Sequence, residues 1–162
     1  AFVDAGFHAV EVAGALLGSG RASRMYRTLV RERRVAKDVM AYVFPLITGA
    51  SMLLVWATGY PGADPATLEG ALIDQLEGLA SVSEEEVKRA VALTDTRFVR
   101  TLEEVSERAD LLSMFTLFFD DPDRLNHEMD RIRSVTPADV RAVAERWLGP
   151  DNRAVLAYEP GP

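Results

Sequence analysis

The chain has 162 residues, of which 48% are hydrophobic and 27% charged, the size and composition of one globular domain. Its net charge is −7, so the chain is a poor match for a phosphate backbone and we expect no nucleic-acid partner. It has no cysteine, which excludes disulfides and thiolate metal sites. No apolar run reaches the roughly 18 residues of a membrane span. We therefore expect a soluble protein, most simply a cytoplasmic one.

Hydrophobic periodicity predicts two helices first, over residues 5–17 and 21–34, with Gly18-Ser19-Gly20 as the turn between them. Residues 38–47 and 51–60 have the composition of strands and are expected to pair as an antiparallel hairpin. The second of these strands is apolar nearly throughout, which favours a strand that is central in the sheet or covered on both faces.

Helix-start signals mark the second half of the chain. Asp64 precedes Pro65, and Ser83 stands three residues before Glu86, as in a capping box. Thr136 begins a further capping motif. Helices are predicted over 65–79, 83–119, 123–135 and 136–149. A short final strand is predicted over residues 153–158.

This element order predicts an α+β fold with a mainly antiparallel sheet packed against several helices. No linker or internal repeat divides the chain, so residues 1–162 are predicted to form a single domain. Three strands make a thin sheet for so many helices. We therefore expect that a first strand is missing and that residue 1 lies inside a longer polypeptide.

Few residues could carry self-contained chemistry. His8 and Glu11 share a helix face, but a zinc-peptidase helix needs a second histidine one turn away, so we interpret them as an ordinary surface pair. His127 and Glu128 are adjacent and are expected to be solvated. Neither histidine is placed to activate a serine. The glycines at 18 and 20 follow a helix rather than a strand, which indicates a turn and not a phosphate loop.

Arginines cluster in an otherwise acidic chain. The cluster consists of Arg21, Arg24, Arg27, Arg31, Arg33 and Arg34. Such guanidinium groups could bind a peptide backbone or terminus, or they could simply pair with the surplus acids of the chain. The residues alone thus indicate a domain that binds something or that supplies part of a site completed elsewhere.

An ordered set of motifs resembles the pitrilysin/insulinase family of zinc peptidases. Residues 16–26 (LLGSGRASRMY) resemble the family's LGGG-x-x-SRLY, and residues 29–34 (LVRERR) its LVREKRGLAY. Residues 83–90 (SEEEVKRA) are similar to TEEELERAK. Residues 135–140 (VTPADV) and 150–155 (PDNRAV) resemble VTAEDV and PDNRAV. The resemblance covers roughly residues 8–158.

The resemblance implies one lobe of a clamshell built from homologous α+β lobes. In this family an inverted H-x-x-E-H motif binds zinc, which polarises the scissile carbonyl while the glutamate activates water. This chain has no such motif, so it resembles the C-terminal, non-zinc lobe. Zinc is then expected in a catalytic lobe of the same chain or in a partner subunit, and no metal or cofactor in this chain. The expected substrate is a peptide, and this chain alone is predicted to be inactive.

The non-zinc lobe of the family contributes an arginine and a tyrosine seven residues apart. Arg31 matches the arginine and is the one catalytic candidate, as a substrate contact. Asp38 stands at the tyrosine position, where a carboxylate would be unfavourable near a developing oxyanion. Val35 replaces the family glycine. Gly18, Gly20 and Arg24 match a motif whose role we interpret as structural.

Three functions remain open from the sequence. The first is the substrate-enclosing C-terminal domain of a zinc metallopeptidase. The second is a catalytically inactive homologue that acts as a scaffold or partner subunit. The third is an independent peptide-binding module.

Overall fold

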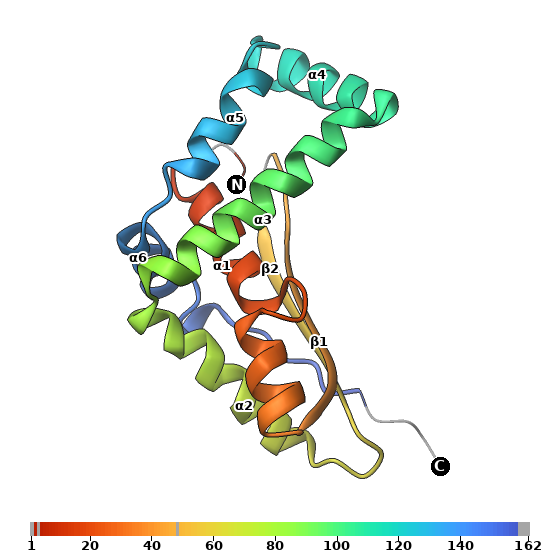
Figure 1. Cartoon of the computed structure of the whole chain (residues 1–162), viewed down its shortest axis with the longest axis vertical. Coiled ribbons are helices and arrows are strands. Elements are labelled where there is room, and N and C mark those ends of the chain that lie inside the picture. Colours follow the sequence, from red (N-terminus) through yellow and green to blue (C-terminus); the bar gives the residue numbers. More distant parts are fainter. Residues whose placement is uncertain (1, 3, 48, 159–162) are drawn as a thin grey trace.

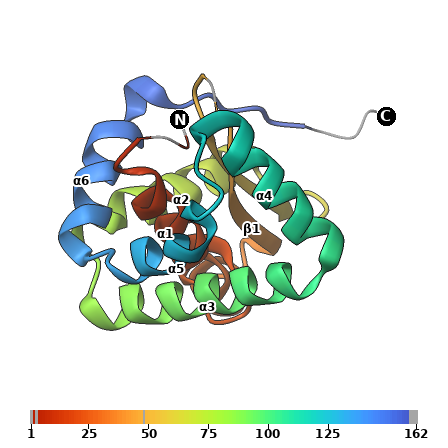
Figure 2. The same ribbon diagram turned by 90° about the horizontal axis from the view of Figure 1, so that it is seen from above.

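The computed structural model describes residue 2, residues 4–47 and residues 49–158. Its centre is helix α1 (Phe7–Gly18), which lies between the hairpin of β1 (Ala36–Phe44) and β2 (Met52–Gly59) and the long helix α3 (Glu84–Glu103) (Figures 1 and 2). Every residue of α1 from 12 to 18 is buried. The hydrophobic core therefore forms on both sides of this one helix, against the hairpin and against α3.

The predicted hairpin is confirmed, with β1 and β2 antiparallel. Their register places Met40 opposite Trp56, and one irregularity interrupts it near Asp38. Alternate residues such as Ala41 face α1, whereas their neighbours are exposed. The prediction that residues 51–60 form a strand covered on both faces is wrong, because β2 follows the two-residue period of a strand with one open face.

Helix α1 approaches β1 so closely that its last residue must be glycine. A Cβ atom on Gly18 would lie 2.5 Å from Cβ of Ala41 and 2.6 Å from the carbonyl carbon of Met40, and closer still to the backbone nitrogen of Ala41. Gly20, in the following turn, has a left-handed φ of +76°. Both glycines of this motif therefore have a structural role, as predicted: Gly18 allows the close contact of α1 with β1, and Gly20 the turn that follows.

The arginine-rich segment is helical over a shorter range than predicted. Residues 21–23 form a turn, and residues Tyr26–Glu32 then form a π-helix, η1. Arg34 follows in a left-handed conformation with φ +51°. Val35, which stands where the resembled motif has glycine, does not have a positive φ. A side chain is therefore tolerated at this position.

Capping side chains begin the helices where the sequence predicted. Asp64 accepts bonds from the backbone N–H groups of Ala66 and Thr67, and both Ser83 and Thr136 complete capping boxes. The long predicted helical region breaks at residue 104. The helices after β2 are α2 (Pro65–Glu77), α3, α4 (Val105–Phe119), α5 (Arg124–Arg133) and α6 (Pro137–Trp147), with short 3₁₀ turns η2 (Gly78–Ser81) and η3 (Pro150–Asn152).

The predicted final strand over residues 153–158 is wrong. Arg153 has extended backbone angles, but the segment joins no ladder in the described part of the chain. A strand needs a neighbour for its backbone hydrogen bonds, and this segment pairs with neither free edge of the β1–β2 hairpin. The α+β fold class is confirmed, with a two-stranded antiparallel sheet among the residues described.

His8 and Glu128 form a buried ionic network that joins α1 to α5. His8 is only 12% exposed, and its Nε2 lies 3.1 Å from Oε2 of Glu128, while Nδ1 lies 3.4 Å from Glu11. Glu128, 3% exposed, also accepts hydrogen bonds from Arg124 and Arg131 at 3.0 and 3.1 Å. The prediction of a surface pair at 8 and 11 is therefore wrong.

The neighbouring residues 127 and 128 were both predicted to be solvated. This is correct for His127, whose side chain is 62% exposed beside Asp123. It is wrong for Glu128, because α5 turns this side chain toward α1. Adjacent residues on a helix point about 100° apart, so the two can lie in opposite environments.

Candidate functional site

Arg31 lies in the last turn of η1, which packs against β1. Its side chain is exposed and forms no ion pair or side-chain hydrogen bond with the described residues. Asp38 lies on β1 and is also exposed, and no ion pair connects it to Arg31. The structure therefore leaves the Arg31 guanidinium free to meet a ligand.

Asp38 takes part in a short chain of hydrogen bonds across the hairpin. Thr58, its register partner on β2, donates from Oγ1 to Oδ2 of Asp38 at 3.2 Å. The indole Nε1 of Trp56 donates to the same Thr58 oxygen at 3.3 Å. The carboxylate of Asp38 thus orients a hydroxyl and, through it, a large aromatic ring on the exposed side of the sheet.

Six large apolar side chains cover the side of the hairpin that faces away from α1. They are between 39% and 56% exposed and stand opposite one another in three cross-strand pairs. These residues, which we call the outer face, are Met40, Tyr42, Phe44, Met52, Leu54 and Trp56. A contiguous apolar patch of this kind usually marks a surface that contacts another molecule.

A pocket opens where the hairpin ends, next to the start of α2. It has a volume of about 330 Å³, and its walls include Val35, Tyr60, Pro61 and Leu68, with Arg34 beside them. We call it the hairpin-end pocket. Asp64 also lines it, so the apolar walls adjoin one cation and one carboxylate. Such a pocket suits an apolar side chain with polar neighbours.

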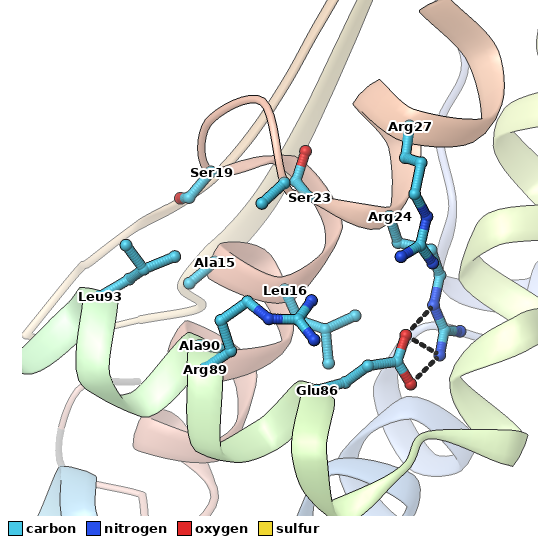
Figure 3. A pocket seen from close by; sticks show the side chains of 11 residues that line it. Ala15, Leu16, Ser19, Ser23, Arg24, Arg27, Glu86, Arg89, Ala90 and Leu93 are labelled. Atoms are coloured by element: carbon cyan, nitrogen blue, oxygen red, sulfur yellow. Dashed lines mark hydrogen bonds and ion pairs between the residues drawn. The ribbon is translucent and has the colours of Figure 1, made fainter. Parts of the chain in front are cut away.

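Arg24, the motif arginine, is fully engaged inside the molecule. Its guanidinium donates to both carboxylate oxygens of Glu86 at 2.8 Å, which joins the segment before η1 to α3 (Figure 3). Burial raises the pKa of Glu86, but bonds from Ser83 and Arg24 outweigh it and leave that pKa below its ordinary value. Arg24 therefore has a structural role. Figure 3 shows Arg27 beside this pair without a bond to it.

Residues 6–94 match the family model of the peptidase M16 inactive domain. The chain belongs to this family. The matched range contains α1, η1 and the whole hairpin, and so it includes Arg31, Asp38 and the outer face.

Three relatives show how far this M16 inactive domain resembles known proteins. An uncharacterized zinc protease of Streptomyces coelicolor is 28% identical over 146 residues, which cover 87% of this chain and 31% of that protein. The inactive peptidase domain of a candidate zinc protease from Bordetella parapertussis is 26% identical, with a TM-score of 0.85 over 99% of this chain and 87% of that one. A protease from Helicobacter pylori, 22% identical, shares the fold with a TM-score of 0.80 over 92% of this chain and 36% of that one. This M16 inactive domain thus spans about a third of the curated relative.

The described residues of the domain do not fit a zinc site. They contain no group of three or more potential ligands arranged around a common point. His8 and Glu128 are close together, but Arg124 and Arg131 bond to the same carboxylate, and two guanidinium groups would repel a divalent cation. Within the described ranges, no helix of the domain is long and apolar enough to cross a membrane.

Sequence reasoning proposed Arg31 as a site residue, which stays a prediction, and missed the outer face of this M16 inactive domain. The signal was present: Met40, Tyr42 and Phe44 alternate on one strand, and Met52, Leu54 and Trp56 on the next. A strict two-residue alternation of large apolar residues on two paired strands predicts one common face. The hairpin-end pocket left no comparable pattern, because its walls come from α2 and from the two loops that precede β1 and follow β2.

Proposed function

We propose that this domain is the non-catalytic lobe that encloses the peptide substrate of a zinc metallopeptidase. In this proposal another lobe or a partner subunit binds the zinc, which polarises the scissile carbonyl when bound. The outer face is the observation that carries the proposal. It offers a broad apolar surface on the open side of the sheet. The exposed guanidinium of Arg31 lies on η1, which packs against β1 of the same hairpin.

The outer face suits an enclosed, extended peptide. Covering its six side chains would remove apolar area from water, which favours binding by about 25 cal/mol for each Å² covered. Such contacts favour apolar residues of the peptide and require no single side chain among them. Closure over this face would also exclude water from the region where the other lobe performs the reaction.

Asp38 limits the part that this lobe takes in the reaction itself. Its carboxylate already accepts the Thr58 hydroxyl and carries a negative charge, so it cannot stabilise a developing oxyanion. Arg31 remains available to bind the substrate backbone or a carboxylate. In the proposed function the residues of this lobe therefore bind and orient the peptide, and the polarising groups belong to the other lobe.

The same Asp38 favours a second candidate function, that of a catalytically inactive scaffold or partner subunit. If the family tyrosine is needed for turnover, its replacement leaves a lobe that keeps the fold and loses the chemistry. The outer face would then bind another protein permanently. The two functions differ in whether the intact natural protein cleaves peptides.

Substitution of a cross-strand pair on the outer face tests the enclosing role. In the intact natural protein, we expect Tyr42→Ser with Leu54→Ser to lower kcat/KM for an unstructured peptide by at least about tenfold, because apolar contact with the substrate is lost. The matched control is Leu117→Ser on α4, which is 77% exposed and lies outside the hairpin. An unchanged kcat/KM in a double variant that unfolds at the wild-type temperature contradicts the enclosing role.

A further inference from the structure

Positive charge is concentrated in one short segment of this acidic chain. Residues 21–38 contain seven cations and two carboxylates, whereas the remaining residues contain eleven cations and 23 carboxylates. The segment therefore carries a net charge of +5 and the remainder −12. Such a separation of charge creates a local attraction for anions that the overall charge of −7 conceals.

Most cations of this segment lack a partner within the chain. Arg24 pairs with Glu86 and Arg33 with Asp74. The others are exposed and form no ion pair or side-chain hydrogen bond with the described residues, although carboxylates are in excess elsewhere. These free cations are Arg21, Arg27, Arg31, Arg34 and Lys37.

One of the free cations borders the hairpin-end pocket, and two others are three residues from that cation along the chain. Arg34 borders the hairpin-end pocket, Arg31 is in the turn of η1 that leads to it, and Lys37 is near the start of β1. Nearby carboxylates do not cancel this charge. Glu32 and Asp38 belong to the segment, and Asp64, which caps α2, lines the pocket. Together with Asp74 and Glu86, the partners of Arg33 and Arg24, they are five carboxylates against seven cations, so an excess of two positive charges remains.

We propose that the peptide bound at this end of the hairpin is acidic. Its carboxylates pair with Arg31, Arg34 and Lys37, and an apolar side chain next to them enters the hairpin-end pocket. The inference rests on the proposed function and adds the substrate class: extended segments in which aspartate or glutamate neighbours a large apolar residue. Guanidinium groups suit this role because they bind carboxylates through two parallel hydrogen bonds.

The test compares two labelled peptides with the intact natural protein. Both are unstructured and identical, except that three glutamates in one are glutamines in the other. Binding is followed by fluorescence anisotropy in the presence of a chelator, which prevents cleavage. We expect the glutamate peptide to bind at least tenfold more tightly at 50 mM salt, about 1.4 kcal/mol. The preference should shrink at 300 mM salt, because exposed ion pairs are screened.

Variants show whether these cations cause the preference. Arg31→Gln with Lys37→Gln should remove it, whereas Arg100→Gln with Arg108→Gln, which removes two exposed arginines from α3 and α4, should leave it intact. Equal binding of both peptides overturns the inference and leaves the proposed function standing. If neither peptide binds, both the inference and the proposed function are contradicted. A protein that is dimeric, becomes monomeric in the Arg31/Lys37 variant and has no glutamate preference would show that these cations bind a second copy, which also overturns the inference.

Discussion

Replacing Gly18 with alanine is expected to lower the free energy of unfolding by about 3 kcal/mol or more. The new methyl group would overlap the backbone of β1 at Met40 and Ala41, and neither side of that contact can move alone. Helix α1 would have to shift from the hairpin, and the core on both of its sides would open. Urea denaturation monitored by tryptophan fluorescence measures the change.

Gly70→Ala is the matched control for this substitution. Gly70 lies inside α2, and a Cβ atom there would meet nothing within 4 Å. Alanine at an open helical position stabilises by roughly 0.5–1 kcal/mol, because glycine loses more backbone entropy on folding. Glycine-to-alanine substitution should therefore destabilise the protein at Gly18 and stabilise it at Gly70. A cost at Gly18 below 1 kcal/mol would show that the α1–β1 junction is looser than the structure describes.

The second large effect is expected from Glu128→Gln, which leaves the cations around this buried carboxylate uncompensated. Burial raises the pKa of Glu128, but the hydrogen bond from His8 and the charges of His8, Arg131 and Arg124 outweigh it and lower that pKa. The carboxylate is therefore ionised at neutral pH. Removing one partner of a buried ionic network costs about 3–5 kcal/mol, so we expect a loss of that order at pH 6. A loss below 1 kcal/mol would mean that the network contributes little.

His8 gives the same network a specific pH dependence. Burial by itself lowers the pKa of His8, but hydrogen bonds to Glu11 and Glu128, together with their charges, raise it to about 9. A raised folded-state pKa contributes stability that is complete below the unfolded value near 6.5 and is lost as the pH rises through 9. The difference corresponds to up to about 3 kcal/mol, at about 1.4 kcal/mol for each pKa unit.

Urea midpoints at pH 6 and pH 9.5 measure this contribution. The wild-type chain should lose most of the stability that His8 contributes between pH 6 and pH 9.5. The His8→Gln variant should be less stable than wild type at pH 6, and its stability should hardly depend on pH over this range. His127→Gln, on the exposed side of α5, should keep the wild-type profile. A wild-type chain that is equally stable at both pH values contradicts the raised pKa.

The features that the sequence predicted well depend on neighbours along the chain. The caps at Asp64, Ser83 and Thr136 need only a side chain and a backbone group three residues away. The hairpin was predictable because two strand-like segments lie close together in the sequence. Gly18 was assigned a structural role from its motif, although the close contact that requires it lies on β1.

The features that the sequence could not predict depend on partners far along the chain. His8 meets Glu128, which lies 120 positions away, and nothing local indicates that pairing. Residues 153–158 do have the composition of a strand. A strand also needs a neighbouring strand to pair with, which composition does not predict. The hairpin-end pocket likewise arises only when the start of β1, the end of β2 and α2 come together.

The most direct test of the central claim uses the intact natural protein. Its zinc content is measured, together with its cleavage of unstructured peptides with and without a chelator. If this domain is the enclosing lobe of a zinc metallopeptidase, the protein contains zinc and the chelator abolishes cleavage. Substitutions on the outer face then weaken cleavage without removing the metal. A protein that contains no zinc and cleaves no peptide contradicts the claim and identifies the domain as a scaffold that kept the fold without the chemistry.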